Sequence, residues 1–270
     1  MVFLDPSPIA FSIGPLAVRW YGLFAAIIFA ATYLAVPYLA RRRFGDEDKV
    51  FWQNVVVVAL VSGIIGSRIA HVLVAWETYA AAPLDAFKVW QGGLTTHGAI
   101  IGGILGLWWY AHRHKRHVLD LTDTVSVPFI FGLALGRVGN IMNQEIMGRP
   151  CPGPWPGCPI SFEWGNDRTG EAIARHPVQL YAIAKNLITG SIVTALYLKT
   201  RTRGIVTAAW IVLYGGMRFI VEFYRDEPLV LGPLDLVQVI TLPVIIFAMV
   251  WLSRLLVQER RIEEGEPETS

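Results

Sequence analysis

The sequence predicts an all-α protein that crosses a membrane several times, and three observations support this prediction. Hydrophobic residues make up 54% of the 270 residues and charged ones only 16%, whereas soluble proteins average about 45–50% and about 25%. The chain also contains ten Trp, nine Tyr and 25 Gly, types that gather at membrane interfaces and at close helix contacts. Apolar runs of roughly 20 residues recur throughout. An ordinary soluble domain is therefore excluded, and a nucleic-acid partner is not expected.

Seven apolar segments predict membrane-spanning helices. The third is short unless the Gly-rich stretch from Gly92 joins it, so we expect a break or re-entrant turn at its outer end. The fifth is the weakest because it contains Lys185 and Asn186. The predicted spans are residues 21–40, 54–75, 98–112, 121–139, 178–198, 205–223 and 229–252.

Basic residues predict the orientation of these spans, because short cytoplasmic loops retain Lys and Arg. A basic cluster follows every odd-numbered span, which fits seven helices with the N-terminus outside and the C-terminus cytoplasmic. The first span follows no basic segment and is itself followed by three Arg, so we interpret it as an uncleaved anchor. The clusters are Arg41-Arg42-Arg43, Arg113-Lys115-Arg116, Lys199-Arg201-Arg203 and Arg254 with Arg260-Arg261.

The domain organisation is simple. Residues 1–258 are expected to form one membrane domain, with a small extracytoplasmic head at about 140–177 and a disordered cytoplasmic tail at 259–270. Two cysteines cannot make a disulfide scaffold. Cys151 and Cys158 lie in the head, where an oxidising compartment would permit pairing as a loop staple. We expect no catalytic chemistry from either.

Charges inside the apolar spans are the strongest sign of a functional site, since each costs ~2.5–3.5 kcal/mol at a helix centre. Arg68, Arg137, Arg218 and Glu222 are such residues, and helix rise places the arginines in the outer half of the membrane, near the depth of His97. Three guanidinium groups and one carboxylate favour binding of an anion, for which a phosphate is well suited. The alternative is that Arg68 and Arg137 extend to the outer headgroups.

The sixth span has one polar face. Tyr214, Arg218, Glu222 and Arg225 recur at spacings of four, four and three residues, which places them on the same side of a helix. The structural alternative is an intrahelical Arg218–Glu222 pair that merely allows insertion. Such a pair would still leave two arginines over.

The run GRVGNIMNQEIMG, residues 136–148, places Arg137 and Asn140 beside two glycines. It resembles the signature of bacterial prolipoprotein diacylglyceryl transferases. Similar blocks occur in the same order over most of the chain: IGPLAVRWYGL around Tyr21, GGLTTHG around His97, RHPVQLY around His176 and YGGMRFIVEFYR from Tyr214 to Arg225.

This resemblance implies transfer of a diacylglyceryl group from phosphatidylglycerol to the lipobox cysteine thiol of a prolipoprotein signal peptide, with release of glycerol phosphate. It also implies a bacterial cytoplasmic membrane location, with the site toward the outer leaflet. The implied catalytic residues are His97, Arg137, Arg218 and Tyr214, and the implied substrate-binding residues are Arg137, Asn140, Glu145, Tyr21, Glu222 and Arg68.

Several positions depart from the family pattern. Ala99 and Ile141 replace a common Gly and Phe, which are mild changes. Ala182 stands where the family commonly has Glu, and Val237 where it has Gly. These two leave open a divergent paralogue with an altered lipid or peptide preference.

The chemistry of the residues agrees with thiol alkylation, because arginines stabilise both a thiolate and a leaving phosphate. His97 suits the role of base by its intrinsic pKa, but a packed or capping histidine fits equally well. His176 is expected to be structural. The sequence predicts no metal site and no cofactor. An anion or lipid transporter using the same arginines is the alternative function, and it predicts a polar route to both membrane faces.

Overall fold

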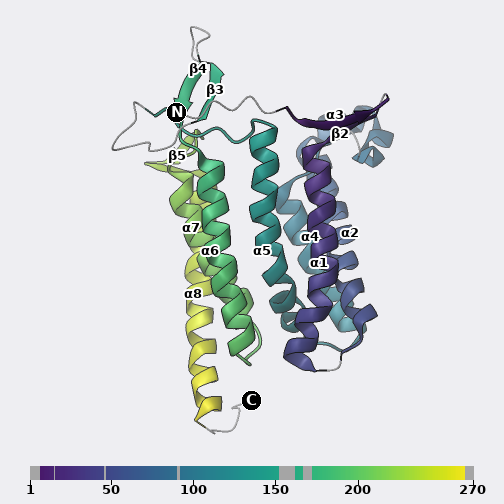
Figure 1. The fold of residues 1–270 in the computed structure, drawn as a ribbon, viewed down its shortest axis with the longest axis vertical. Helices are drawn as coiled ribbons and strands as arrows, with labels where there is room; N and C mark the ends of the chain where they lie inside the picture. Colours follow the sequence, from purple (N-terminus) through teal and green to yellow (C-terminus); the bar gives the residue numbers. More distant parts are fainter. Residues whose placement is uncertain are drawn as a thin grey trace. The chain divides into compact units, whose positions relative to one another are not determined.

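The computed structural model describes residues 7–14, 16–45, 47–89, 92–151, 162–166 and 172–264. This part of the chain is mostly helical, and six of its helices are long and apolar enough to cross a membrane. The predicted all-α polytopic membrane fold is therefore confirmed (Figure 1). The long helices are α1 (Trp20–Phe44), α2 (Lys49–Val74), α4 (Thr96–Arg113), α5 (Val118–Met142), α6 (Val178–Lys199), α7 (Ile205–Glu222) and α8 (Leu236–Glu263).

Shorter elements connect these helices. A helical turn pair, α3 (Trp76–Ala81) and η1 (Pro83–Phe87), separates α2 from α4. Three antiparallel strand pairs complete the described elements: β1 (Ile9–Ile13) with β2 (Leu16–Arg19), β3 (Phe162–Asn166) with β4 (Ala172–Arg175), and β5 (Leu229–Leu231) with β6 (Leu234–Asp235).

The chain divides into two compact units, which are described separately. Unit 1 comprises Met1–Ala31 and Ser126–Ser270, and unit 2 comprises Thr32–Val125. Unit 1 contains most of α5 together with α6, α7 and α8. It also includes the β3–β4 pair, which precedes α6 in the sequence and lies near the end where α6 begins (Figure 1). Unit 2 contains α2, α3, η1 and α4.

Unit 2 depends on close packing between α2 and α4. A Cβ atom added at Gly66 would lie 2.5 Å from the Gly98 carbonyl oxygen and 2.7 Å from the Gly102 Cα atom. A Cβ atom at Gly102 would collide with the Ser62 carbonyl oxygen. Glycine therefore lets the two helix backbones touch, as in other closely packed membrane helices.

Unit 1 places α7 beside α6 and α8. Asp235 caps α8 by accepting a hydrogen bond from the Gln238 amide nitrogen at 2.8 Å, while the Gln238 side chain accepts one from the Asp235 amide nitrogen. The Gln238 side chain also donates to the Phe219 carbonyl oxygen of α7 at 2.9 Å. This capping box fixes where α8 begins and joins it to α7.

Two of the sequence-based boundaries need correction. The seventh span begins at Leu236 and not at 229, because residues 229–235 form the β5–β6 hairpin around Gly232, whose φ is +57°. The predicted tail from 259 overlaps α8, which continues to Glu263. The Glu259 carboxylate is buried and accepts hydrogen bonds from the Arg201 and Thr202 amide nitrogens, both at 2.7 Å, which orders this end of the helix.

The third predicted span is present as α4 but is not one of the six apolar helices. Its 18 residues include two histidines, an arginine and four glycines, which lower its hydropathy. The break expected between the glycine-rich stretch and this helix is confirmed, while the outward orientation of this end stays a prediction. Gly92 and Gly93 have φ values of +90° and +72°, and the helix begins only at Thr96, after Thr95 accepts a hydrogen bond from the Gly98 amide nitrogen.

Candidate functional site: a cationic cluster at one end of unit 1

The last turns of α5 carry a chain of polar contacts. Arg137 Nη1 donates to Asn140 Oδ1 at 3.2 Å, and Asn140 Nδ2 donates to Glu145 Oε2 at 3.0 Å. Asn143 Nδ2 donates to the other Glu145 carboxylate oxygen at 3.2 Å. Glu145 thereby orients Asn140, and Asn140 in turn orients the Arg137 guanidinium. The structure thus brings together three of the residues predicted to bind substrate.

The turn after α5 has an unusual backbone. Gln144 and Ile146 both have positive φ, at 53° and 66°. This region is costly for a β-branched residue such as Ile146. The fully buried Gln179 of α6 holds the turn, because its Nε2 donates to the Glu145 and Ile146 carbonyl oxygens at 2.6 and 2.8 Å. The Glu145 side chain is therefore positioned by α6 as well as by α5.

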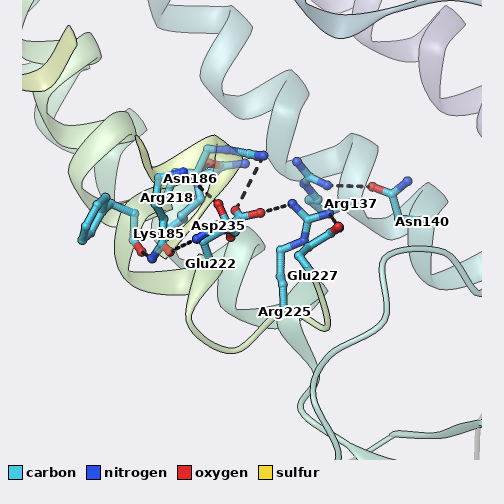
Figure 2. Close-up of polar contacts among 11 residues, drawn as sticks. Arg137, Asn140, Lys185, Asn186, Arg218, Glu222, Arg225, Glu227 and Asp235 are labelled. Carbon is cyan, nitrogen blue, oxygen red and sulfur yellow. Dashed lines mark hydrogen bonds and ion pairs between the residues drawn. The ribbon is translucent and has the colours of Figure 1, made fainter. Parts of the chain in front are cut away.

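The polar face predicted for α7 is present and centres on Glu222. This carboxylate is almost fully buried, pairs with Arg218 at 3.6 Å and with Arg225 through a shorter contact. Arg225 also pairs with Glu227 at 2.7 Å. The intrahelical Arg218–Glu222 pair that the sequence offered as an alternative thus exists, but it is part of a larger cluster (Figure 2).

Lys185 of α6 adds a further cation. It is 6% exposed, its Nζ donates to Asn186 Oδ1 at 2.8 Å, and the same nitrogen lies 3.7 Å from the centroid of the Tyr214 ring. Trp210 stacks parallel to that ring at 5.1 Å. Tyr214 is therefore held by packing on α7 and by a cation–π contact from α6.

These groups form one electrostatic cluster in unit 1. Arg137 interacts with Tyr214, Arg218 and Arg225, and Lys185 interacts with Arg137, Arg218 and Glu222. Arg137 lies five residues from the end of α5, Lys185 seven from the start of α6 and Arg218 four from the end of α7. At 1.5 Å per residue, all three lie roughly 6–11 Å from helix ends.

The cluster is short of negative charge. We define it as Arg137, Lys185, Arg218 and Arg225 with Glu222 and Glu227, which gives four cations and two carboxylates. Burying like charges together is unfavourable unless an anion compensates them. The arrangement can therefore bind an anionic group such as phosphate, with guanidinium groups suited to contacting two oxygens at once.

Tyr21 approaches the same helix end. A Cβ atom added at Gly139 would lie 3.1 Å from Tyr21 Cδ2 and 3.5 Å from Phe24 Cδ2. The glycine beside Asn140 thus lets α1 approach α5. Tyr21 itself is half exposed.

Arg68 and His97, both predicted site residues, belong to unit 2. Arg68 is buried and donates to the carbonyl oxygens of Asp85, Ala86 and Gly92 at 2.6–2.8 Å, with longer contacts to Gly93 and Lys88. Its donors hold the η1 segment and the glycine turn, so this geometry does not support the expected direct contact with substrate. It does not support extension to the headgroups either.

His97 is exposed in the first turn of α4, where Thr95 and not the histidine caps the helix. The structure therefore argues against the capping alternative for His97. Its role as a base stays a prediction.

The head is described only in part. Cys151 is disulfide-bonded, and Cys158 lies outside the described residues. His176 Nδ1 lies 3.3 Å from the Tyr181 hydroxyl, and its ring packs edge-on against Tyr224. Burial lowers the pKa of His176 below its ordinary value, which agrees with a structural role.

A helical membrane protein with buried cations near one end of its helices fits the class of membrane proteins that carry a functional polar site among apolar helices. The comparison with known families is specific. The model of the prolipoprotein diacylglyceryl transferase family matches residues 8–254, and the chain belongs to this family.

Curated relatives are similar over nearly their whole length. A phosphatidylglycerol–prolipoprotein diacylglyceryl transferase from Aeromonas salmonicida is 36% identical over 264 residues, covering 93% of this chain and 92% of that protein. Proteins of the same name from Vibrio cholerae and Cupriavidus pinatubonensis are 35% and 34% identical, covering 96% and 97% of this chain and 96% of each relative.

Sequence reasoning assigned no role to two side chains of this site. Lys185 weakens the prediction of the fifth span, although a lysine among apolar residues is itself a signal of function. Gln179 lies in the RHPVQLY block, but its contact with a turn more than thirty residues away has no local sequence signal.

Proposed function

We propose that this protein transfers the diacylglyceryl group of phosphatidylglycerol to the lipobox cysteine thiol of prolipoprotein signal peptides. The reaction forms a thioether and releases glycerol phosphate. Family membership and the names of the relatives support the reaction class. The observation that supports this site as its location is the cluster of four cations with only two carboxylates.

In this proposal Arg137 binds the phosphate of phosphatidylglycerol, with its guanidinium oriented by Asn140 and Glu145. Arg218 approaches from α7, on the same face as Tyr214 and Glu222. Tyr21 borders the lipid from α1. Negative charge grows on the leaving phosphate in the transition state, and the guanidinium groups stabilise that charge. This lowers the barrier, because the groups bind the transition state more strongly than the substrate.

The nucleophile is the thiol of the precursor, and its sulfur attacks the glycerol carbon that bears the phosphate. An arginine cannot take the thiol proton, so we propose His97 as the base. We further propose that the site faces the outer leaflet of the bacterial cytoplasmic membrane. The basic last turns of α1, α4, α6 and α8 support this orientation, since such residues favour the cytoplasmic side.

The test is incubation of the purified protein with phosphatidylglycerol vesicles and a lipobox peptide. Mass spectrometry should show one diacylglyceryl group per cysteine and an equal amount of glycerol phosphate. The thioether bond between sulfur and the glyceryl carbon should survive mild base, which removes only the ester-linked acyl chains. A peptide with Ser in place of the lipobox cysteine is the control and should stay unmodified. Lipid movement between leaflets without peptide modification would instead support the transporter alternative and contradict this proposal.

A further inference from the structure

Lys185 is a buried basic residue of the cluster, and the proposed function assigns it no role. It is less exposed than Arg218, and its neighbours in the cluster are two further cations and one carboxylate. Among the described residues, no carboxylate lies within ion-pair distance of its Nζ. The Glu222 carboxylate, which interacts with Lys185, already pairs with Arg218 and Arg225.

The contacts of Lys185 leave part of its binding capacity for a ligand. An ammonium group has three N–H donors. One is used by Asn186 Oδ1, and the Tyr214 ring contacts the same nitrogen through its π face. Both partners are neutral, so they hold the side chain in place without neutralising its charge. Ala182, one turn earlier on the same face, is buried and uncharged.

The proposed reaction changes the charge of the phosphate, and this change suggests what the extra cation recognises. The C–O bond between glycerol carbon and phosphate oxygen breaks, its electron pair stays on the phosphate, and an S–C bond forms as the thiol proton leaves to a base or water. A phosphodiester with one negative charge thus becomes a monoester, whose second pKa is about 6. The leaving group therefore carries nearly two negative charges at pH 7.

We propose that Lys185 is a specificity-determining residue that recognises the second negative charge of the departing phosphate monoester. This inference rests on the proposed function. It assigns Arg137 to the charge already present in the lipid and Lys185 to the charge that develops on cleavage. An interaction of this kind favours the transition state over the bound substrate, so its loss lowers kcat more than it raises KM.

The experiment compares binding of two small anions to the full-length protein in detergent at pH 7. Glycerol phosphate carries about two negative charges, and its methyl ester carries one. We expect the parent to bind the dianion at least about tenfold more tightly by calorimetry. Lys185→Met should reduce this ratio to within about threefold, while Lys185→Arg should keep most of it.

Lys199→Met is the matched control. Lys199 ends the same helix 14 residues later, ~21 Å away, and is exposed. The Lys199→Met variant should keep the parent's preference for the dianion. If Lys185→Met fails a thermal-unfolding check, Lys185→Gln provides the same comparison, since its amide can still donate to Asn186.

An unchanged dianion preference in the folded neutral variant would overturn the inference, and so would an equal loss in Lys199→Met. Because this measurement needs neither peptide nor turnover, it is independent of thioether formation by the parent, on which the proposed function itself depends.

Discussion

Arg68 and Arg137 show how one sequence signal leads to different structural roles. Both are arginines within apolar helices, and both were predicted to bind substrate. Arg68 donates to backbone carbonyls of a connecting segment, whereas Arg137 contacts a side-chain amide that is itself held by Glu145. The charge of these side chains and their position within apolar spans predicted a functional role for both. They did not predict the partners, because those partners are loop carbonyls set by the tertiary fold.

His176 yields a prediction about pH. Burial lowers its pKa, so the folded protein binds this proton less readily than the unfolded chain, whose histidine pKa is about 6.5. The stability that depends on the neutral form is therefore present above pH 6.5 and is lost as the pH falls through the lower folded-state pKa.

We expect the thermal midpoint in detergent to fall between pH 7.5 and pH 5, and to fall less in His176→Gln. His112→Gln, in the last turn of α4, is the control and should follow the parent. Parallel curves for the parent and His176→Gln would contradict the structural role given to His176.

Helix packing yields a prediction that separates two adjacent glycines of α4. At Gly102 a Cβ atom would collide with the backbone of α2, whereas at Gly103 the nearest atom, the Ala59 carbonyl oxygen, would lie 3.7 Å away. Gly102→Ala should lower the free energy of unfolding by about 1–3 kcal/mol. Gly103→Ala should change it by less than about 0.5 kcal/mol.

Thermal unfolding of both variants in the same detergent measures this difference. Equal stability of the two would show that α2 and α4 do not pack through their glycines.

The helices were predictable because hydrophobic length is a local property, and six of the seven predicted spans are confirmed as long apolar helices. Their ends were less predictable. The hairpin before α8 depends on the Gly232 turn and on the Asp235–Gln238 capping box, both of which interrupt an otherwise apolar run. The end of α8 depends on Glu259 contacting a loop more than fifty residues away. Distant contacts of this kind leave no periodic signal in a sequence.

The whole chain has a predicted orientation that follows from its basic clusters. Reporter fusions at Arg42, Lys115, Arg201 and Arg260 should all report the cytoplasm, because short cytoplasmic loops retain positive charge. A fusion near Trp155, outside the described residues, should report the opposite side. A cytoplasmic signal at that position would contradict both the orientation and an outward-facing site.

The central claim is that the cationic cluster of unit 1 is the phosphate site of a diacylglyceryl transferase, and Arg137→Lys tests it most directly. Lysine keeps the charge but lacks the planar fork that can hold two phosphate oxygens and that donates to Asn140 Oδ1. Loss of a charge-assisted contact costs ~1.5–3 kcal/mol, or roughly tenfold to over a hundredfold in rate. Arg41→Lys, at the exposed end of α1, is the matched control.

The measurement is the initial rate of thioether formation from phosphatidylglycerol and a lipobox peptide, for variants of equal thermal stability. We predict that Arg137→Lys loses at least about tenfold in rate while Arg41→Lys retains the parent rate. A well-folded Arg137→Lys protein working within about threefold of the parent would contradict the account, because that site would then need only a charge and not a guanidinium group.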